Sequence, residues 1–264
     1  MAILESRTKT GVRWVTESVA LFKLTPRKWL LLALSYLGIF VFIPSFPGLQ
    51  LFSFVTILIW PIFIAIAMRM YRNAEVKKDE NLSSIMQLVQ PKMRELLLLG
   101  LISLFYFILV SIILSADLQA ITETMEKQAQ LTEQEMVLAI GQTVTPVLLK
   151  LTLLFIPLMA AVWFAPMLIV FNGYSVMKSI KSSIAGSLQY VVAMTAAWLL
   201  LTAGIISLIL TVSLVAGLFA FIQPDFAQSL MTMLIFGCLL VSIALTLAVQ
   251  YVSYRDIFRA APNA

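Results

Sequence analysis

Residues 175–201 read SVMKSIKSSIAGSLQYVVAMTAAWLLL, a short amphipathic segment that runs without a clear break into a long apolar one. Lys178 and Lys181 lie off the apolar side of this segment. Such a segment suits a membrane surface, because its apolar side chains enter the interface while its lysines stay among the headgroups. We therefore predict a surface helix over 175–188 that leads into a membrane-spanning helix. Apolar residues recur at intervals of 3, 4 and 4 residues, which is one face of an α-helix, at Met177, Ile180, Ile184 and Leu188.

The composition indicates a membrane protein with several spans. Hydrophobic residues make up 61% of the 264 residues, charged residues 12%, and the mean hydropathy is +0.99. A soluble domain has about 25% charged residues, twice this share. A membrane helix needs roughly 20 apolar residues, so the chain has room for six spans with loops and surface helices between them.

Six apolar stretches alternate with charged ones along the chain. The predicted spans are 29–46, 49–68, 96–115, 146–171, 190–214 and 226–252. Amphipathic segments at 11–24, 81–90 and 175–188 precede the first, third and fifth spans. We predict a single all-α membrane domain, 1–264, of six transmembrane helices arranged as three hairpins. Each hairpin follows an interfacial amphipathic helix on the cytoplasmic face.

Residues 116–145 form the one sizeable polar stretch outside the basic loops. Thr132 and Glu135 have the spacing of a capping box, in which two side chains satisfy backbone N–H groups at a helix start. Gly141 is a plausible helix stop. We predict an extracytoplasmic helical insertion of two short amphipathic helices. It acts either as a partner site or as a passive cap.

The basic residues predict the orientation. Placing both termini and the segments 69–95 and 172–190 on one side of the membrane gathers 16 of the 18 lysines and arginines there. Basic loops stay in the cytoplasm, so both termini are predicted to be cytoplasmic. The opposite side receives Asp117, Glu123, Glu126, Glu133, Glu135 and Asp225.

Two residue types limit the chemistry. Cys238 is the single cysteine, which excludes an internal disulfide and any metal site built from several cysteines. The chain has no histidine, the commonest metal ligand and general base. Known catalytic and nucleotide-binding motifs are missing from the sequence. We predict a protein that is not an enzyme, without catalytic, metal-binding or cofactor-binding residues.

Basic and aromatic residues near the inner ends of the spans are candidate contacts for anionic lipid headgroups, through charge-assisted hydrogen bonds. An ordinary interfacial anchor belt is the alternative. Lys150 is a candidate outer-face contact for a lipid phosphate or a partner carboxylate, or its side chain simply reaches the outer interface. The inner candidates are Arg69, Tyr71, Arg72, Lys178, Lys181, Tyr254 and Arg255.

Small and hydroxylated residues recur in the last two spans. They allow helices to approach closely, either within the bundle or at a face that binds a partner. They are Gly204, Ser207, Thr211, Ser213, Gly217, Ser242, Ala244, Thr246 and Ala248.

Three stretches carry a resemblance to a known group of proteins. Trp14, Phe22, Pro26 and Trp29 form the first; the second joins 165–168 to Tyr174-Ser175 and the serines up to Ser187; the third is 253–258. Together they resemble a family of uncharacterised six-helix bacterial inner-membrane proteins. They are more loosely similar to the membrane domain of some glycerophosphodiester phosphodiesterases. Several relatives have an arginine–asparagine pair where this chain has Leu188-Gln189. The resemblance implies the fold and a bacterial inner (plasma) membrane location, and it implies no activity.

Three functions are weighed. The favoured one is a non-enzymatic integral membrane protein that interacts with lipid or serves as an accessory or scaffold component of a membrane complex. A transporter or lipid-translocating protein is the first alternative, and an enzyme acting on lipid headgroups at the interface is the second. The expected partners are membrane lipids with anionic headgroups and other integral membrane proteins, and not nucleic acid, because the basic charge lies in membrane-adjacent segments.

Overall fold

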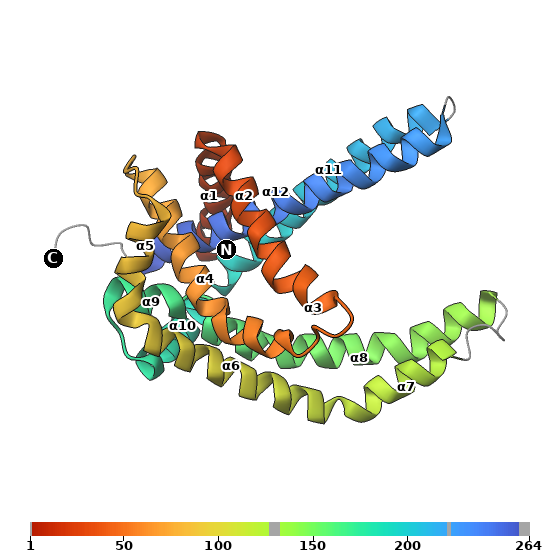
Figure 1. Cartoon of the computed structure of the whole chain (residues 1–264), viewed down its shortest axis with the longest axis horizontal. Helices are drawn as coiled ribbons and strands as arrows, with labels where there is room; N and C mark the ends of the chain where they lie inside the picture. The colour runs from red at the N-terminus through yellow and green to blue at the C-terminus, as the bar shows by residue number, and fades with distance from the viewer. Residues whose placement is uncertain (1, 127–132, 221–222, 259–264) are drawn as a thin grey trace.

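The structure is a computed structural model that describes residues 2–126, 133–220 and 223–258. Its regular elements are all helical, and no strand occurs in these three segments (Figure 1). The first half contains α1 (Ala2–Leu24), α2 (Pro26–Leu37), the π-helical turn η1 (Gly38–Phe42), α3 (Ile43–Ser45), α4 (Phe52–Glu75), α5 (Leu82–Val89), the 3₁₀ turn η2 (Gln90–Lys92) and α6 (Met93–Ile113). The second half contains α7 (Ser115–Glu126), α8 (Glu133–Val162), α9 (Ala165–Asn172), α10 (Val176–Gln189), α11 (Val191–Ala220) and α12 (Pro224–Phe258).

Six helical segments among the described residues are long and apolar enough to cross a membrane. The predicted all-α fold with six helices of membrane-spanning length is therefore confirmed. Helices suit this environment because they satisfy all their backbone hydrogen bonds internally. The segments are Pro26–Ser45, Phe52–Glu75, Leu82–Ile113, Gly141–Asn172, Val191–Phe219 and Pro224–Phe258.

Pro91 interrupts the chain less than expected. The sequence predicts a helix break there, between a surface helix over 81–90 and a span over 96–115. In the structure α5 leads through the short turn η2 into α6, and one candidate span covers both. A proline at the first position of a helical turn loses no hydrogen bond, because its N–H has no partner there in any case.

The predicted insertion over 116–145 differs from the structure in its second half. Residues 127–132 lie outside the described residues. Gly141 does not end a helix, because α8 begins at Glu133 and continues through Gly141 to Val162. A glycine inside a helix costs only about 1 kcal/mol relative to alanine. The long apolar stretch that follows outweighs this cost, so the second predicted short helix continues into the fourth span as α8, whereas the first corresponds to α7.

Helix α1 is packed into the bundle along much of its length. It lies against α11 and α12, and the side chains of Trp14 and Ser18 are fully buried. Gly11 permits this approach, because a Cβ atom there would lie 2.3 Å from the backbone oxygen of Ala193. The prediction of an interfacial helix over 11–24 puts Trp14 at the membrane interface, whereas the structure places its ring in the core.

Helix α10 turns its serines toward the protein and the two ends of its apolar stripe outward. Ser179, Ser183 and Ser187 are buried, whereas Met177 and Leu188 are 64% and 65% exposed. The stripe identified in the sequence is therefore exposed at its two ends, Met177 and Leu188, and half-buried in its middle, at Ile180 and Ile184. Lipid suits the exposed apolar side chains, while hydroxyl groups form hydrogen bonds inside the bundle.

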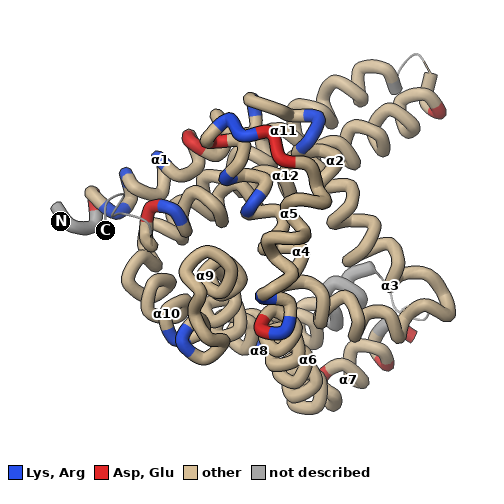
Figure 2. The backbone as a smooth tube through the Cα atoms, turned by 60° about the vertical axis from the view of Figure 1, so that its left-hand side comes forward, with Lys and Arg blue, Asp and Glu red and all other residues tan. Residues whose placement is uncertain are grey.

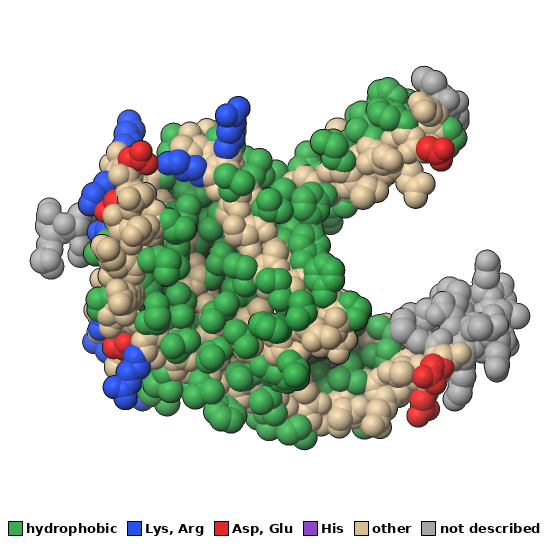
Figure 3. Space-filling model, viewed as in Figure 1, with side chains coloured by type: hydrophobic (Ala, Val, Ile, Leu, Met, Phe, Trp, Pro, Cys, Tyr) green, Lys and Arg blue, Asp and Glu red, His purple; other side chains and the backbone are tan. Residues whose placement is uncertain are grey.

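The long helices separate into two arms. Figure 1 shows the α11–α12 pair and the α6–α7–α8 group extending away from the common body in diverging directions. Hydrophobic side chains cover most of both arms and the body on the face shown in Figure 3. Lysines and arginines gather on the body, together with some acidic residues, whereas the charged residues coloured at the far ends of the arms are acidic (Figure 2). We call the lysine- and arginine-rich part of the body the basic end.

The small residues of the last two spans divide into two groups. Ala244 and Ala248 are fully buried, so they serve close packing within the bundle. Gly204, Ser207 and Thr211 are exposed on α11. Close packing thus explains the alanines of α12 and leaves the α11 group on the surface.

We expect Gly100→Ala to destabilise the protein by about 2 kcal/mol, because overpacking a close contact typically costs this much. A Cβ atom at Gly100 on α6 would lie 2.1 Å from the backbone oxygen of Leu58 on α4. Backbone atoms cannot rotate away, so the two helices must separate. The measurement is the midpoint of thermal unfolding in detergent. Gly204→Ala is the matched control, since no atom lies within 4 Å of its added Cβ, and an equal loss in both variants contradicts the prediction.

Candidate functional site

Two predicted lipid contacts, Tyr71 and Tyr254, are fully buried. The Tyr71 hydroxyl donates to the backbone oxygen of Ala244 at 2.8 Å, and the Tyr254 hydroxyl donates to Asn172 Oδ1 at 2.5 Å. Tyr71 also stacks on Trp29, with ring centroids 4.0 Å apart. These tyrosines join α4, α9 and α12 inside the body, and their hydroxyls are occupied by protein acceptors.

Arg255, another predicted lipid contact, lies in an ion-pair network between three helices. Its guanidinium donates to Glu17 on α1 and to Glu75 on α4. The Tyr251 hydroxyl donates to the same Glu75 carboxylate at 2.5 Å. Arg255 is therefore positioned to connect the N-terminal helix with the second and sixth spans.

The neighbouring residue Asp256 makes a second connection to α1. Its Oδ2 accepts hydrogen bonds from Arg13 at 2.6 Å and from the indole nitrogen of Trp14 at 2.9 Å. An indole N–H is a donor only, and burying it requires an acceptor. Asp256 supplies that acceptor, which explains why the Trp14 ring enters the core. No spacing in the sequence pairs Trp14 with Asp256, because 242 positions separate them.

Arg69 and Arg72 also contact protein groups. Arg69 donates to both carboxylate oxygens of Glu80 at 3.4 Å, and Arg72 lies over the ring of Phe171, 5.5 Å from its centroid. The Glu80 carboxylate also accepts hydrogen bonds from Lys78 and Asn73, and these two, with Arg69, lower the pKa of Glu80 to about 2. Glu80 is thus ionised at neutral pH and fixed to the end of α4.

The remaining predicted contacts are lysines with exposed ammonium groups. Lys178 and Lys181 lie on the outer side of α10, and Lys178 Nζ is 3.9 Å from the ring centroid of Tyr174. Lys150 pairs with Asp117 at 2.8 Å, which joins α8 to α7. Asp117 belongs to the same chain. Lys150, the predicted outer-face contact for a lipid or a partner, therefore forms an internal ion pair.

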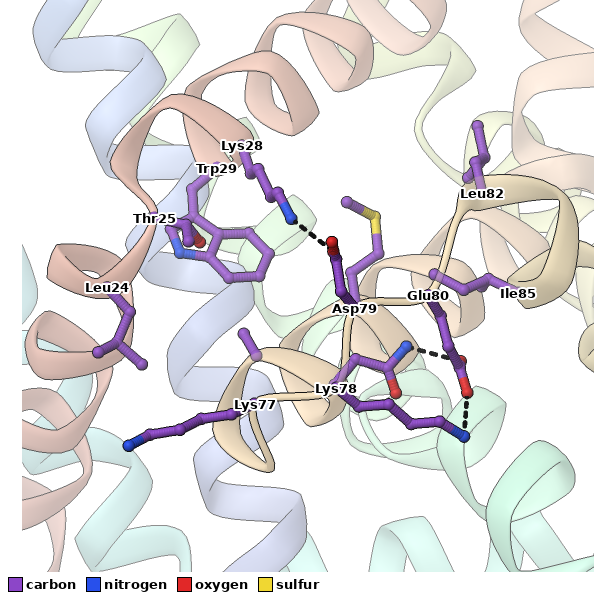
Figure 4. Close-up of a pocket in the computed structure, with 13 residues that line it drawn as sticks. Leu24, Thr25, Lys28, Trp29, Lys77, Lys78, Asp79, Glu80, Leu82 and Ile85 are labelled. Atoms are coloured by element: carbon purple, nitrogen blue, oxygen red, sulfur yellow. Dashed lines mark hydrogen bonds and ion pairs between the residues drawn. The ribbon is translucent and has the colours of Figure 1, made fainter.

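The basic end contains a cavity of about 430 Å³ where α1, α2, α4 and α5 meet. Figure 4 shows Leu24, Thr25 and Trp29 on one side of it and the 77–80 loop on the other. Its volume is in the usual range of ligand sites, about 300–1,000 Å³. The apolar part of its lining consists of Leu24, Trp29, Met70, Leu82 and Ile85.

Most of the polar lining lies at or next to two places where helices end, between α1 and α2 and in the 77–80 loop after α4. Thr25 precedes α2, and its hydroxyl is buried without a hydrogen-bond partner among the described residues. Lys28 Nζ pairs with Asp79 Oδ1 at 3.2 Å, and these side chains are 60% and 93% exposed. Such an exposed pair contributes only about 0–1 kcal/mol, so either partner exchanges it easily for a ligand.

Lys77 has an unusual backbone conformation beside the cavity. Its φ is +53°, the single positive value among the described residues other than glycine. The amides of Lys77 and Lys78 donate to the backbone oxygens of Ala74 and Asn73, which ends α4 in a Schellman motif. Glycine is the usual residue at this position. Lys77 adopts this conformation without being glycine, and its ammonium has no ion-pair partner within the described segments.

Sequence reasoning missed this cavity. Thr25 and residues 73–80 lie outside the predicted helices and spans and received no binding role. Each stretch carries adjacent basic residues at a break, Arg27-Lys28 and Lys77-Lys78, which is the one local signal in the sequence. Their meeting depends on the packing of α1, α2 and α4, because about 50 residues separate them, 51 in the case of Lys28 and Asp79.

A second hollow lies among the spans rather than at their ends. It is an apolar groove of about 570 Å³ between α8, α10 and α11. Phe155, Met159 and Trp198 line it, with Trp163 at the same groove. The indole N–H of Trp163 is buried and has no hydrogen-bond partner in the described part of the chain. The lining suits hydrocarbon chains rather than a polar solute.

The described residues form an all-helical protein with six helices of membrane-spanning length and an amphiphilic cavity at its basic end, which is compatible with a multi-pass membrane protein. Comparison of the chain with protein-family models, curated proteins and solved structures finds no match. The resemblance to six-helix inner-membrane proteins therefore stays a prediction.

Proposed function

We propose that this protein is a non-enzymatic integral membrane protein that binds a phospholipid headgroup in the cavity between α2, α4 and α5. The single observation that carries this proposal is the composition of the cavity. Its lining is divided between charged side chains (Lys28, Lys77, Lys78, Asp79 and Glu80) and apolar ones (Leu24, Trp29, Met70, Leu82 and Ile85). An amphiphile has the same division, with a charged headgroup and apolar chains.

The energetics of the cavity support a phosphate ligand. To bind a phosphate, Lys28 gives up only an exposed and weak ion pair. Lys77 has no ion pair among the described residues to give up. Two ammonium groups therefore become available at little cost. Charge-assisted hydrogen bonds from lysine to phosphate are about twice as strong as neutral ones.

The surface around the cavity also suits a lipid whose chains stay in the membrane. Leu24 and Leu82 line it and are 55% and 58% exposed, so apolar surface continues outward from the charged groups. The separation of basic body and acidic arm ends in Figure 2 favours a cytoplasmic location for this end. The proposed setting is the bacterial inner membrane with both termini in the cytoplasm, and the lipid is drawn from the inner leaflet.

The test compares lipid retention in two variants. Lys77→Gly removes one ammonium and supplies the residue that the backbone prefers, so unfolding stability is expected to rise by about 0.5–1 kcal/mol. Lys28→Ser removes the other ammonium. We expect each to lower retained phospholipid by about tenfold, equivalent to about 1.4 kcal/mol. Native mass spectrometry after purification in mild detergent measures the retained lipid.

Lys9→Ser is the matched control for this test. Lys9 pairs with Glu5 at 2.8 Å, and their side chains are 75% and 69% exposed, so it resembles Lys28 in exposure and pairing but does not line the cavity. Retention should be unchanged in this variant. Full retention in Lys77→Gly and Lys28→Ser together would overturn the proposal, and the higher stability of Lys77→Gly shows that misfolding does not explain a loss.

Lipid translocation is the second candidate, and the groove between α8, α10 and α11 favours it. This groove provides an apolar surface on the spans about 18 Å long, from Leu151 to Trp163 at 1.5 Å per residue. That length is sufficient to span one leaflet of the hydrocarbon core, about 15 Å. Movement of a fluorescent lipid between leaflets of reconstituted vesicles, at rates above protein-free vesicles, would favour translocation over binding alone.

A further inference from the structure

The cavity at the basic end has charges of both signs, and this limits the headgroups that fit it. Lys28, Lys77 and Lys78 provide positive charge, and Asp79 and Glu80 provide negative charge. A site for a purely anionic headgroup gains nothing from carboxylates in its lining, because like charges repel at short range. The carboxylates therefore need an explanation of their own.

The presence of the Glu80 carboxylate in the lining is explained by its contacts within the protein. Its two oxygens contact Arg69, Asn73 and Lys78, with the Asn73 and Lys78 contacts at 2.7 and 2.6 Å. Glu80 and Lys78 satisfy each other and stabilise the end of α4. Neither group is available to a ligand without breaking these contacts.

Asp79 is different, because the protein makes little use of it. Its side chain is 93% exposed, and Lys28 is its one ion-pair partner in the described residues. Figure 4 shows the Lys28 ammonium and the Asp79 carboxylate facing each other across the space between α2 and the 77–80 loop. A ligand that binds Lys28 through a phosphate takes away that partner and leaves the Asp79 carboxylate beside the bound phosphate.

We infer that the cavity recognises a phosphoethanolamine headgroup, which joins a phosphate to a primary ammonium. The phosphate accepts a hydrogen bond from Lys28, and the ammonium donates to Asp79, the two groups that face each other in Figure 4. The internal pair between Lys28 and Asp79 is thus replaced by two pairs with the ligand, and no charge is left without a partner. This inference rests on the proposed function and names its lipid class, phosphatidylethanolamine.

The experiment measures which lipid the purified protein enriches from its surroundings. The full chain is reconstituted in nanodiscs that contain equal amounts of phosphatidylethanolamine, phosphatidylcholine and phosphatidylglycerol. Lipids retained after extraction into mild detergent are counted by native mass spectrometry. We expect about tenfold enrichment of phosphatidylethanolamine over phosphatidylcholine, whose quaternary ammonium has no N–H to donate to Asp79.

Asp79→Asn is the decisive variant. The amide has nearly the same shape as the carboxylate and lies on the surface, so folding should be unchanged, which the thermal midpoint verifies. We expect the preference for phosphatidylethanolamine over phosphatidylglycerol to fall by about tenfold in this variant. Lys28→Ser should lower retention of both lipids. Soluble glycerophosphoethanolamine added as a competitor distinguishes the sources: displacement by it alone shows a headgroup site, and no displacement shows that the acyl chains are needed.

The outcomes separate the inference from the proposed function. Equal retention of phosphatidylglycerol and phosphatidylethanolamine, unchanged in Asp79→Asn but lost in Lys28→Ser, overturns the inference and leaves lipid binding in place. Retention that none of the cavity variants alters overturns both. Loss of the phosphatidylethanolamine preference in Asp79→Asn with an unchanged thermal midpoint supports the inference.

Discussion

Arg255→Met is expected to lower the unfolding free energy by about 2 kcal/mol, between the values for exposed and for buried ion pairs. Arg255 binds Glu17 and Glu75, and its own side chain is 29% exposed. Methionine keeps similar length and apolar contacts but removes every donor. Two carboxylates are then left close together without their shared cation, and they repel each other.

The measurement is thermal unfolding in detergent, with α1 expected to detach first. Arg255 and Asp256 supply the ion pairs between α1 and α12, so hydrogen exchange should rise in residues 11–24 before the spans unfold. Adding Glu17→Gln and Glu75→Gln to Arg255→Met should restore part of the stability, because it removes the unpaired charges. Lys9→Met is the control for an exposed pair, and a loss as large as that of Arg255→Met would contradict the argument.

Ser183→Ala is expected to cost about 2–3 kcal/mol, because it leaves buried backbone groups without partners. Helix α8 is separated from α9 by two non-helical residues, Trp163 and Phe164. There the Ser183 hydroxyl accepts from the Phe164 amide at 3.0 Å and donates to the Ala160 oxygen at 2.7 Å. One hydroxyl therefore bridges the two groups that would bond directly in a continuous helix.

This bridge matters more in a membrane segment than on a soluble surface, because no water replaces a lost partner. Ser187 lies 3.5 Å from the same Ala160 oxygen and recovers part of that contact, but nothing replaces the acceptor for the Phe164 amide. The thermal midpoint should fall by several degrees, since about 1 kcal/mol shifts it by roughly 2–4 °C in a chain of this size. Ser182→Ala, on the same helix, should leave the midpoint unchanged, and Ser183→Thr should retain most of the stability. A Ser183→Ala protein as stable as Ser182→Ala would show that the bridge contributes nothing.

The apolar periodicity of α10 shows why the direction of a helix face cannot be read from sequence. The stripe from Met177 to Leu188 was correctly identified as one face. In water an apolar face points to the core, but in a membrane both lipid and core are apolar. The polar side of α10 determines how the helix is oriented. Ser179, Ser183 and Ser187 are buried, because their hydroxyls form hydrogen bonds with backbone groups of the protein, and lipid offers no such partners.

The candidate lipid contacts show a second limit. Arg69, Tyr71, Tyr254 and Arg255 were marked by type and by position at span ends. Arg69 pairs with Glu80 in the following loop, whereas the other three interact with groups far along the chain, as Arg255 does with Glu17 across 238 positions. No periodicity connects such residues, so their use in internal pairs was invisible. Lys28, Lys77 and Asp79 were passed over for the same reason, because a cavity formed by two loops leaves no pattern in either.

By itself the sequence determined the class of the fold. Six runs of about 20 apolar residues require helices in a membrane, where each helix satisfies its own backbone, and the basic residues gather in the loops between particular runs. These are local properties, and local composition decides them. The tertiary structure alone decided that α1 enters the core, that Arg255 joins three helices, and that Lys28 meets Asp79 beside an apolar wall. Those contacts depend on which helices pack together, and the free energy of packing belongs to pairs of distant segments rather than to either one.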